Sequence, residues 1–364
     1  MELQNIESIV DIPEEESKQS EHDRNQPQKH HFHLDTQSHK IIKNPHGGTA
    51  VIPLLHPTHT HFQHGTHENL KLEWSARDHR KGRQNIRIHL AEKPKVPFYK
   101  RVYDRLPAAK HYIQPLNISW WVAMFFTVGS IVWVVNGFFV FLPYVNSSIY
   151  ANYLQAALWT AFAGGTLFEV GATLSLIESL HSQKEKVEFD FKPKKRRIYR
   201  LYRLKLNLRD LGTIANIVQF FAASIFWIST IAGVVPGVVE DPLGGLAIGL
   251  FWTEQVVGGA GFVIASLLLM YETQKKWWMI LNLKSIGWHV GFWNLIGAIG
   301  FLLSGALGYS SGINYATGYQ SGCSTFWGSW AFLIGSVIQL WECIDRNPKK
   351  TIVSSDKQNV QSKA

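Results

Sequence analysis

The stretch "FLIGSVIQLWE" at residues 332–342 closes the last apolar segment of the chain, and two other stretches resemble it. These are "FEVGATLSLIE" at 168–178 and "FVIASLLLMYE" at 262–272. Each begins with Phe, carries Gly or Ala three residues later, has Ala or Ser next, and ends in Glu. The shared spacing predicts one apolar helix that is used three times, with a carboxylate at the end of each copy.

The match extends backwards to a glycine four residues before each phenylalanine. At about 100° per residue, the shared positions fall within an arc of about 120° on one side of a helix. Small residues let helix backbones approach closely in lipid, so this side is predicted to be a repeated packing face. The face consists of Gly164, Phe168, Gly171, Glu178, Gly258, Phe262, Ala265, Glu272, Gly328, Phe332, Gly335 and Glu342.

Charge is absent from two long parts of this 364-residue chain. No Asp, Glu, Lys or Arg occurs from His111 to Phe168 or from Ser285 to Trp341. About 20 apolar residues are enough for a helix to cross the core of a bilayer, so uncharged runs of this length predict transmembrane helices.

The predicted fold class is therefore all-α, a polytopic transmembrane helix bundle. Six spans form three repeated hairpins, 118–178, 211–272 and 286–342. The individual spans are predicted at 118–142, 151–178, 211–236, 245–272, 286–308 and 321–342.

Basic residues lie in alternate loops between these spans. The loops "PYVNSSIY", "PGVVEDPL" and "YSSGINYATGYQS" contain no Lys or Arg, whereas the loop at 181–210 contains eleven. Positive charge stays on the cytoplasmic side of a membrane. The pattern predicts a protein of the plasma membrane or an endomembrane with both its N- and C-termini in the cytosol.

The segments outside the spans are polar. Residues 1–92 are predicted to be a disordered, His-rich cytosolic tail, 93–117 a basic juxtamembrane segment, and 343–364 a short cytosolic tail. The stretch "KPKKRRIYRLYRLKLNLR" at 192–209 interleaves basic residues with Tyr and Leu. Anionic lipid headgroups and RNA are the alternative partners of such a pattern, and tethering between two spans favours lipid over nucleic acid.

The tail holds 14 of the 16 histidines, counted to residue 111. Neutral imidazoles are ligands for zinc and copper. Without Cys or acidic ligands, compositional drift without metal binding is the favoured interpretation of the densest group, so no cofactor is predicted, and a weak zinc or copper site is the alternative. The members of this group are His56, His59, His61, His64 and His67.

A few polar residues lie inside the predicted spans. Glu169 is deep in the second span, where a charge is costly, so it is predicted to be neutral and hydrogen-bonded to an asparagine. Proton or cation transport through it is the functional alternative. The other intramembrane candidates are Glu254, Asn136, Asn216 and Asn294.

The three repeated glutamates each end a helix, where the helix dipole disfavours an anion. Ion pairs that lock neighbouring hairpins are predicted to offset this, and a ring of carboxylates at a pore mouth is the alternative. The cations expected to pair with them are Lys184, Lys186, Lys275, Lys276 and Arg346.

The closing pattern, "GSWAFLIGSVIQLWE" at 328–342, resembles the YrhK-like family of small two-span membrane domains. The resemblance is best over 290–342, weaker over 211–272 and weakest over 118–178. It implies an architecture of two-span hairpins, and it implies no reaction, ligand or catalytic residue.

No nucleotide-binding loop, nucleophile triad or metalloprotease helix occurs in the sequence, so an enzyme is not expected. The predicted role is that of a structural or interaction protein in a membrane. A transporter or channel for protons or metal cations is the alternative.

Overall fold

The structure is a computed structural model. The chain divides into two compact units, residues 1–39 and 40–364, and all described residues belong to the second. The residues that the structure describes are 41–43, 54–56, 58–64, 71–81, 117–146, 148, 150–181, 206, 208–241, 243–274 and 281–344.

Long helices dominate the described residues, and they agree with the predicted segments to within a few residues. The largest differences are at α6, which begins at Glu254 although its span was predicted from 245, and at the last helix, which begins at Tyr315 although its span was predicted from 321. A π-helical turn, η5 (Ala247–Thr253), also precedes α6 and was not predicted. The helices are α3 (Ile118–Val145), α4 (Tyr150–His181), α5 (Leu211–Val234), α6 (Glu254–Glu272), α7 (Ile286–Gly308) and α8 (Tyr315–Ile344).

Side-chain caps fix where two of these helices begin. The side chain of Asn117 accepts a hydrogen bond from the backbone N–H of Ser119, which starts α3. Asp210 accepts from the backbone N–H of Thr213 at 2.9 Å and starts α5 in the same way. Each cap satisfies a backbone donor that the first helical turn leaves without a partner.

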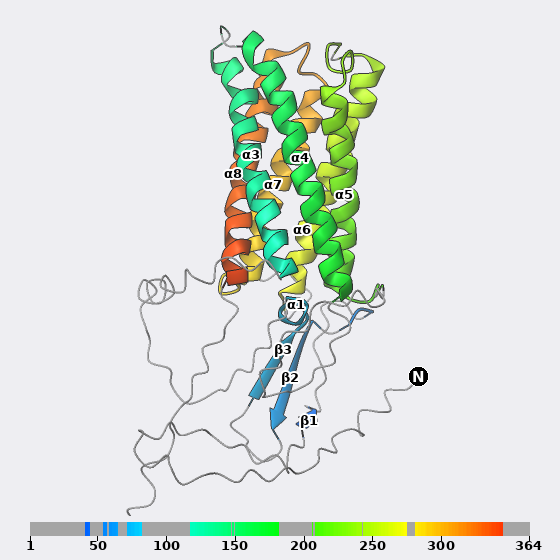
Figure 1. The fold of residues 1–364 in the computed structure, drawn as a ribbon, viewed down its shortest axis with the longest axis vertical. Helices are drawn as coiled ribbons and strands as arrows, with labels where there is room; N and C mark the ends of the chain where they lie inside the picture. The colour runs from blue at the N-terminus through cyan, green and yellow to red at the C-terminus, as the bar shows by residue number, and fades with distance from the viewer. Residues whose placement is uncertain are drawn as a thin grey trace, which may run out of the picture. The chain divides into compact units, whose positions relative to one another are not determined.

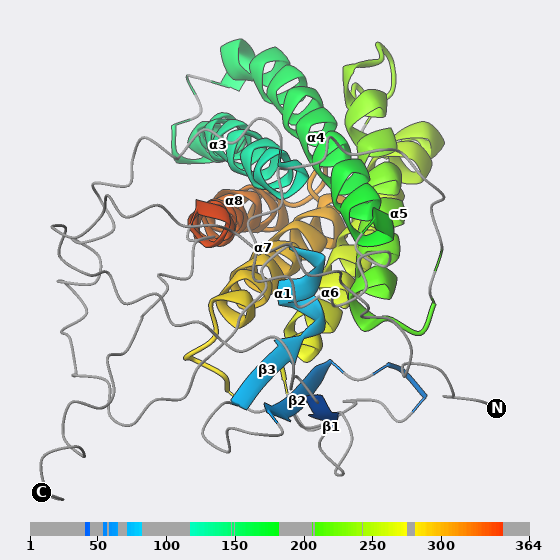
Figure 2. The same cartoon turned by 60° about the horizontal axis from the view of Figure 1, so that its bottom comes forward.

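The six helices form a closed ring. Each packs against its neighbour in sequence, and α8 also packs against α3, which closes the ring (Figures 1 and 2). The pairs α3–α4, α5–α6 and α7–α8 are called hairpins 1, 2 and 3 below. The hairpins therefore follow one another around the ring in chain order.

Large apolar side chains lie on the outside of this ring, the reverse of a water-soluble bundle. Examples with exposed side chains are Val128, Ile131, Val135, Phe221, Ile228, Ile264, Leu303, Ile334 and Val337. Five helices are long and apolar enough to cross a membrane: α3, α4, α5, η5 with α6, and α7. The described part of the chain is therefore consistent with an integral membrane protein.

Aromatic side chains from all six helices fill the centre of the ring, and α3 contributes two of them, Phe126 and Trp133. Trp133 and those from α5 and α7 touch one another with ring centroids 4.7–5.7 Å apart. Those from α4, α6 and α8 form a second group, with the α8 ring 5.5 Å from the α4 ring and 6.3 Å from the α6 ring. Together they make an apolar layer across the bundle, called the aromatic cluster below. Its members are Trp133, Phe226 and Phe301, followed by Phe168, Phe262 and Phe332.

All twelve residues of the predicted packing face are buried. The backbones approach closely where the face carries glycine. A Cβ atom on Gly300 of α7 would lie 2.8 Å from the Cα atom of Gly328 of α8. By contrast, the side chain of Val337 on the opposite side of α8 is 49% exposed.

The polar N-terminal part of the chain contains a small sheet. Strands β1 (Ile41–Lys43), β2 (His59–His64) and β3 (Lys71–Ser75) are antiparallel in the order β1-β2-β3, with Ile42 opposite Gln63 and Phe62 opposite Leu72. Helix α1 (Ala76–Arg80) follows β3 directly. A disordered tail throughout 1–92 and a purely α-helical chain were therefore wrong for these segments. The all-α prediction holds for the bundle.

Candidate functional site

Helix α1 and Lys81, the residue that follows it, carry three basic side chains on one face. The backbone N–H of Asp78 donates to Ser75 Oγ at 3.1 Å, so Ser75 caps the helix. Residues three and four apart share a helical face, which places Arg77, Arg80 and Lys81 together. All three are buried, and buried cations need anionic partners.

The partners are two of the repeated glutamates. Arg80 binds Glu272 through two hydrogen bonds, Nη1–Oε1 at 2.5 Å and Nη2–Oε2 at 2.7 Å. Arg77 also binds Glu342 in a bidentate manner, with Nε–Oε1 at 3.2 Å and Nη2–Oε2 at 3.0 Å. Lys81 Nζ adds a contact of 2.7 Å to Glu342 Oε2. The planar guanidinium matches both oxygens of a carboxylate, so these are strong, oriented ion pairs.

Arg77 also joins the two pairs, because its Nη1 atom lies 3.8 Å from Glu272 Oε2. Glu272 ends α6 and Glu342 lies in the last turn of α8. Helix α1 therefore ties hairpins 2 and 3 together at one end of the bundle. This end, where Glu178, Glu272 and Glu342 lie, is called the α1 end below (Figure 1).

Burial and opposing charge act against each other on the arginines. Burial is the largest single influence and lowers the pKa of Arg80, but Glu272, with smaller contributions from Asp210 and Glu178, outweighs it, so the net pKa is raised. The pKa of Arg77 is also raised, because Glu342 and Glu272 outweigh burial. A cation with a raised pKa stabilises the fold at every pH below its ordinary pKa and loses that contribution only above it. Both arginines therefore stay charged throughout the physiological range.

The third repeated glutamate has a different partner. Ser119 Oγ in the first turn of α3 donates a hydrogen bond to Glu178 Oε1, and Glu178 is buried. The Sγ atom of Cys343 donates to the backbone carbonyl of Ser119 at 3.2 Å, which links hairpin 3 to this pair. Hairpin 1 thus binds its carboxylate through a hydroxyl group.

A single residue position accounts for this difference. Ser119, Gly212 and Gly287 are each the second residue of the first helix of a hairpin. A Cβ atom on Gly212 would overlap the Arg80 guanidinium and lie 2.7 Å from its Cζ atom. A Cβ atom on Gly287 would lie 2.5 Å from the Nε atom of Arg77. The two glycines leave the space that the arginines fill.

Backbone and hydroxyl contacts fasten α1 to the bundle beyond the ion pairs. Thr58 Oγ1 donates to the backbone carbonyl of Gln274, just past α6, at 3.3 Å. The N–H of Ala76 donates to the carbonyl of Thr58 at 2.9 Å. The N–H of His56 donates to the carbonyl of Arg209, before α5, at 2.8 Å. Helix α1 is thus joined to the bundle by a second set of contacts.

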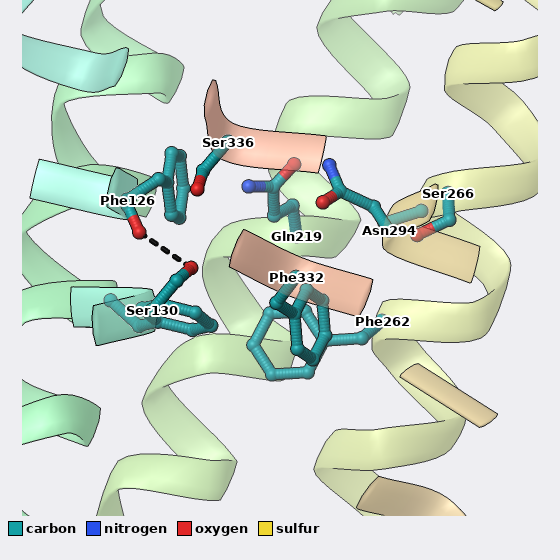
Figure 3. Close-up of a pocket in the computed structure, with 10 residues that line it drawn as sticks. Phe126, Ser130, Gln219, Phe262, Ser266, Asn294, Phe332 and Ser336 are labelled. Atoms are coloured by element: carbon teal, nitrogen blue, oxygen red, sulfur yellow. Dashed lines mark hydrogen bonds between the residues drawn. The ribbon is translucent and has the colours of Figure 1, made fainter. Parts of the chain in front are cut away.

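Two small cavities lie in the bundle between α1 and the aromatic cluster. The one against the aromatic cluster has a volume of about 20 Å³, and the one against α1 about 30 Å³. Each has room for about one water molecule. Phe126, Gln219 and Asn294 line both cavities. Figure 3 shows the amide groups of Gln219 and Asn294 converging with Ser336 on the cavity against the aromatic cluster, called the upper cavity below. The interior is therefore polar at the α1 end.

The structure places Glu169 away from these cavities. Its Oε1 atom accepts a hydrogen bond from Ser224 Oγ of α5 at 3.0 Å. The prediction of an asparagine partner was therefore wrong: Glu169 faces a serine on the neighbouring helix. Sequence depth could not show which way this side chain points around α4.

The three asparagines serve other purposes. Asn136 donates to the carbonyl of Ala157 at 2.6 Å and so joins α3 to α4. Asn216 accepts from Ser175 Oγ at 2.7 Å and joins α4 to α5. Asn294 lines both cavities. Glu254, the remaining intramembrane candidate, is half-buried at the start of α6. Of the five candidates, Asn216 and Asn294 line the cavity next to α1.

The predicted metal ligands are only partly described. His59 and His61 lie in β2 and His64 ends it, His56 precedes it, and His67 lies outside the described residues. Within the described part of the chain, no group of three or more His, Cys, Asp or Glu is placed to hold a metal ion. The histidine site stays a prediction, as does lipid binding by 192–209, of which only residues 206, 208 and 209 are described.

Sequence reasoning missed Arg77, Arg80 and Lys81. The expected partners of the glutamates, Lys184, Lys186, Lys275, Lys276 and Arg346, lie outside the described residues. A signal was present in "WSARDHRK" at 74–81, where a capping serine precedes basic residues at helical spacing. No protein-family model, curated protein or solved structure matches the chain, so the interpretation of this site rests on its own geometry.

Proposed function

We propose that the chain is a six-span integral membrane protein built from three copies of one helical hairpin, with a structural or interaction role rather than an enzymatic one. The spanning role of α8 is supported by its place in the ring, between α7 and α3. The repeat is supported by the aromatic cluster, to which each hairpin contributes one ring from each of its helices. Membership of the YrhK-like family is part of the same proposal.

The observation that carries the proposed role is that the interior of the bundle is closed on both sides. The aromatic cluster closes it toward the end opposite the α1 end, called the far end below. The side chains of Arg77, Arg80 and Lys81 close it at the α1 end. The two cavities between them hold about one water molecule each. In the described part of the chain this arrangement is a packed scaffold without a continuous path for a solute.

A flux assay tests the proposed role. The purified full-length chain is reconstituted into liposomes, and proton and zinc fluxes are followed with trapped fluorescent indicators. We expect rates equal to those of protein-free liposomes, because no solute path crosses the aromatic cluster. An ionophore added at the end shows that the liposomes are sealed. A protein-dependent flux would contradict the proposed role.

Transport of protons or metal cations is the second candidate. It is favoured by one observation, the polar cavity that Gln219 and Asn294 share behind the three carboxylates. If flux is found, Glu169→Gln and Glu272→Gln separate two routes. Loss of flux with Glu169→Gln alone would place the route between α4 and α5. Loss with Glu272→Gln would place it through the centre of the ring.

Orientation is a further part of the proposal. Basic loops at the α1 end favour a cytosolic position for this end and for both chain termini. In a cysteine-free background, Ser147→Cys is expected to react with an impermeant thiol reagent on intact cells that display the protein. Ser182→Cys is expected to react only after the cells are permeabilised. Reversed labelling would place the α1 end outside.

A further inference from the structure

Helix α1 is a short helix that ion pairs hold against the end of the bundle. It has five residues, fewer than an isolated helix needs for stability in water. Its two arginines each bind a glutamate through two hydrogen bonds, and a long stretch of chain, residues 82–116, separates it from α3. Side-chain ion pairs with the helix ends thus hold α1 itself, in addition to the contacts that Thr58 and His56 make before it.

The removal of α1 would leave an unfavourable arrangement of charge. Arg77 touches both Glu342, at 3.0 Å, and Glu272, at 3.8 Å, so the two carboxylates lie on either side of one guanidinium. Both lie at helix C-termini, where the helix dipole disfavours negative charge. Without the cations, the carboxylates repel each other across hairpins 2 and 3. Charge therefore makes α1 the element that holds this end shut.

Helix α1 also forms one wall of the polar interior. The cavity of about 30 Å³ has Arg77, Arg80 and Lys81 on one side and Gln219 and Asn294 on the other. The second cavity begins at the same two amides and ends at the aromatic cluster. If α1 leaves, both cavities open toward the α1 end, while the aromatic cluster still closes them toward the far end.

We propose that the α1 end of the bundle is a receptor for a helical segment bearing two arginines, that α1 occupies this receptor in cis, and that its departure opens the polar interior to one side. Glu272 and Glu342 are the receptor groups, and Gly212 and Gly287 provide the space for the guanidinium groups. The partner is thus a basic segment of the Arg-x-x-Arg-Lys pattern. The proposal rests on the closed ring of the proposed function and is independent of whether the bundle transports anything.

Cysteine accessibility in the purified full-length chain tests the proposal. The background is Cys323→Ser/Cys343→Ser, in which Ser at 343 keeps a hydrogen-bond donor. The reporter is Ser336→Cys, a near-isosteric change at a residue that lines the upper cavity. We expect slow reaction with a small cationic thiol reagent. The added change Arg77→Gln/Arg80→Gln is expected to raise the rate by about tenfold or more, as a shift from a minor to a major open population would.

Matched variants separate opening from general loosening. Ser304 is buried on α7, about one turn beyond Phe301 toward the end of the bundle opposite the α1 end. The Ser304→Cys variant is expected to stay unreactive both with the parent α1 and with Arg77→Gln/Arg80→Gln. Lys284→Gln removes an exposed charge that takes no part in the ion pairs of α1. It is expected to leave the labelling rate of Ser336→Cys unchanged. Glu272→Gln/Glu342→Gln removes the same ion pairs by changing the carboxylates instead of the arginines, so no repelling carboxylates remain. It is expected to raise the rate as the arginine variant does.

Addition of the segment in trans tests the receptor directly. A synthetic peptide of residues 71–83 is added to the Ser336→Cys/Arg77→Gln/Arg80→Gln chain. Because the chain's own α1 no longer competes, the peptide is expected to restore slow labelling. The same peptide with both arginines replaced by glutamine is expected to have no effect. Neither peptide is expected to slow labelling of the Glu272→Gln/Glu342→Gln chain.

Three results would overturn the proposal. The first is equal labelling of Ser336→Cys in the parent and in both charge variants, with parent-like helix content and a monodisperse profile. The second is joint labelling of Ser304→Cys and Ser336→Cys, which would show general loosening of the bundle. The third is failure of the arginine-bearing peptide to protect. Because none of these measures flux, the proposal and the closed-scaffold function can fail separately.

Discussion

Hairpin 1 differs from hairpins 2 and 3 at a position where all three carry the same residue. Glu272 and Glu342 are bound by arginines from α1, whereas Glu178 is bound by the hydroxyl group of Ser119. The three glutamates occupy equal places in a repeated pattern, and all are buried. A residue that recurs in a sequence pattern therefore does not imply a recurring interaction.

The difference follows from the residue that faces each glutamate across its hairpin. Gly212 and Gly287 have no side chain, and the guanidinium groups of Arg80 and Arg77 occupy the space. Ser119 brings its own donor and fills the corresponding space in hairpin 1. Small residues at this end of the bundle thus decide whether a carboxylate is satisfied from within its hairpin or by another part of the chain.

The largest expected effect is at the arginine-paired glutamates. Glu272→Gln leaves the Arg80 guanidinium buried without its counter-charge, and breaking a buried ion pair in this way costs about 3–5 kcal/mol. We expect a marked fall in the melting temperature of the detergent-solubilised protein. Glu240→Gln, at an exposed loop carboxylate, is the matched control and is expected to melt like the parent. Equal melting of Glu272→Gln and the parent would show that α1 contributes little to stability.

The next largest effect is expected from giving hairpin 2 the residue of hairpin 1. Gly212→Ser places a side chain in the space of the Arg80 guanidinium, and overpacking costs about 1–3 kcal/mol before the loss of the ion pair is added. Thermal melting measures the loss, and Gly245→Ser is the control, because a Cβ atom there meets nothing within 4 Å. Parent-like melting of Gly212→Ser would mean that Arg80 repositions freely.

A third effect concerns the packing face that all three hairpins share. Gly335→Leu adds a side chain where a Cβ atom would already lie 2.7 Å from Asn294 Oδ1 and 3.3 Å from Trp293 Cβ. Overpacking of this kind costs about 1–3 kcal/mol. Val337→Leu, on the exposed side of α8, is expected to leave the melting temperature unchanged. Equal melting of the two variants would argue against a packing role for the repeated face.

The smallest effect is expected at Glu178. Glu178→Gln keeps an oxygen that accepts the hydrogen bond of Ser119, so the loss is expected to be about 1 kcal/mol or less. The decisive quantity is the difference between this variant and Glu272→Gln in the same melting assay. If the two lose equal stability, Glu178 is also paired with a cation, and the contrast between hairpin 1 and the other hairpins disappears.

The sequence by itself determined the helices and their buried faces. Hydrophobic runs and helical spacing are local properties, readable within about 30 residues, so the long helices and the face from Gly164 to Glu342 could be predicted from them. Polar groups whose partners lie on another helix were not predictable in this way. Depth along a helix placed Glu169 in the bundle, but only the packing of α4 against α5 gave it Ser224 as a partner.

Only the tertiary structure decided what the repeated glutamates bind. The sequence indicated that carboxylates at helix ends need cations, and nearby lysines were the natural candidates. The cations that bind them come from α1, 192 residues before Glu272 and 265 residues before Glu342. No local pattern encodes a contact over such a separation, because it depends on the ring closing and on Gly212 and Gly287 leaving space. The need for a counter-charge is local chemistry, whereas its source is set by the fold.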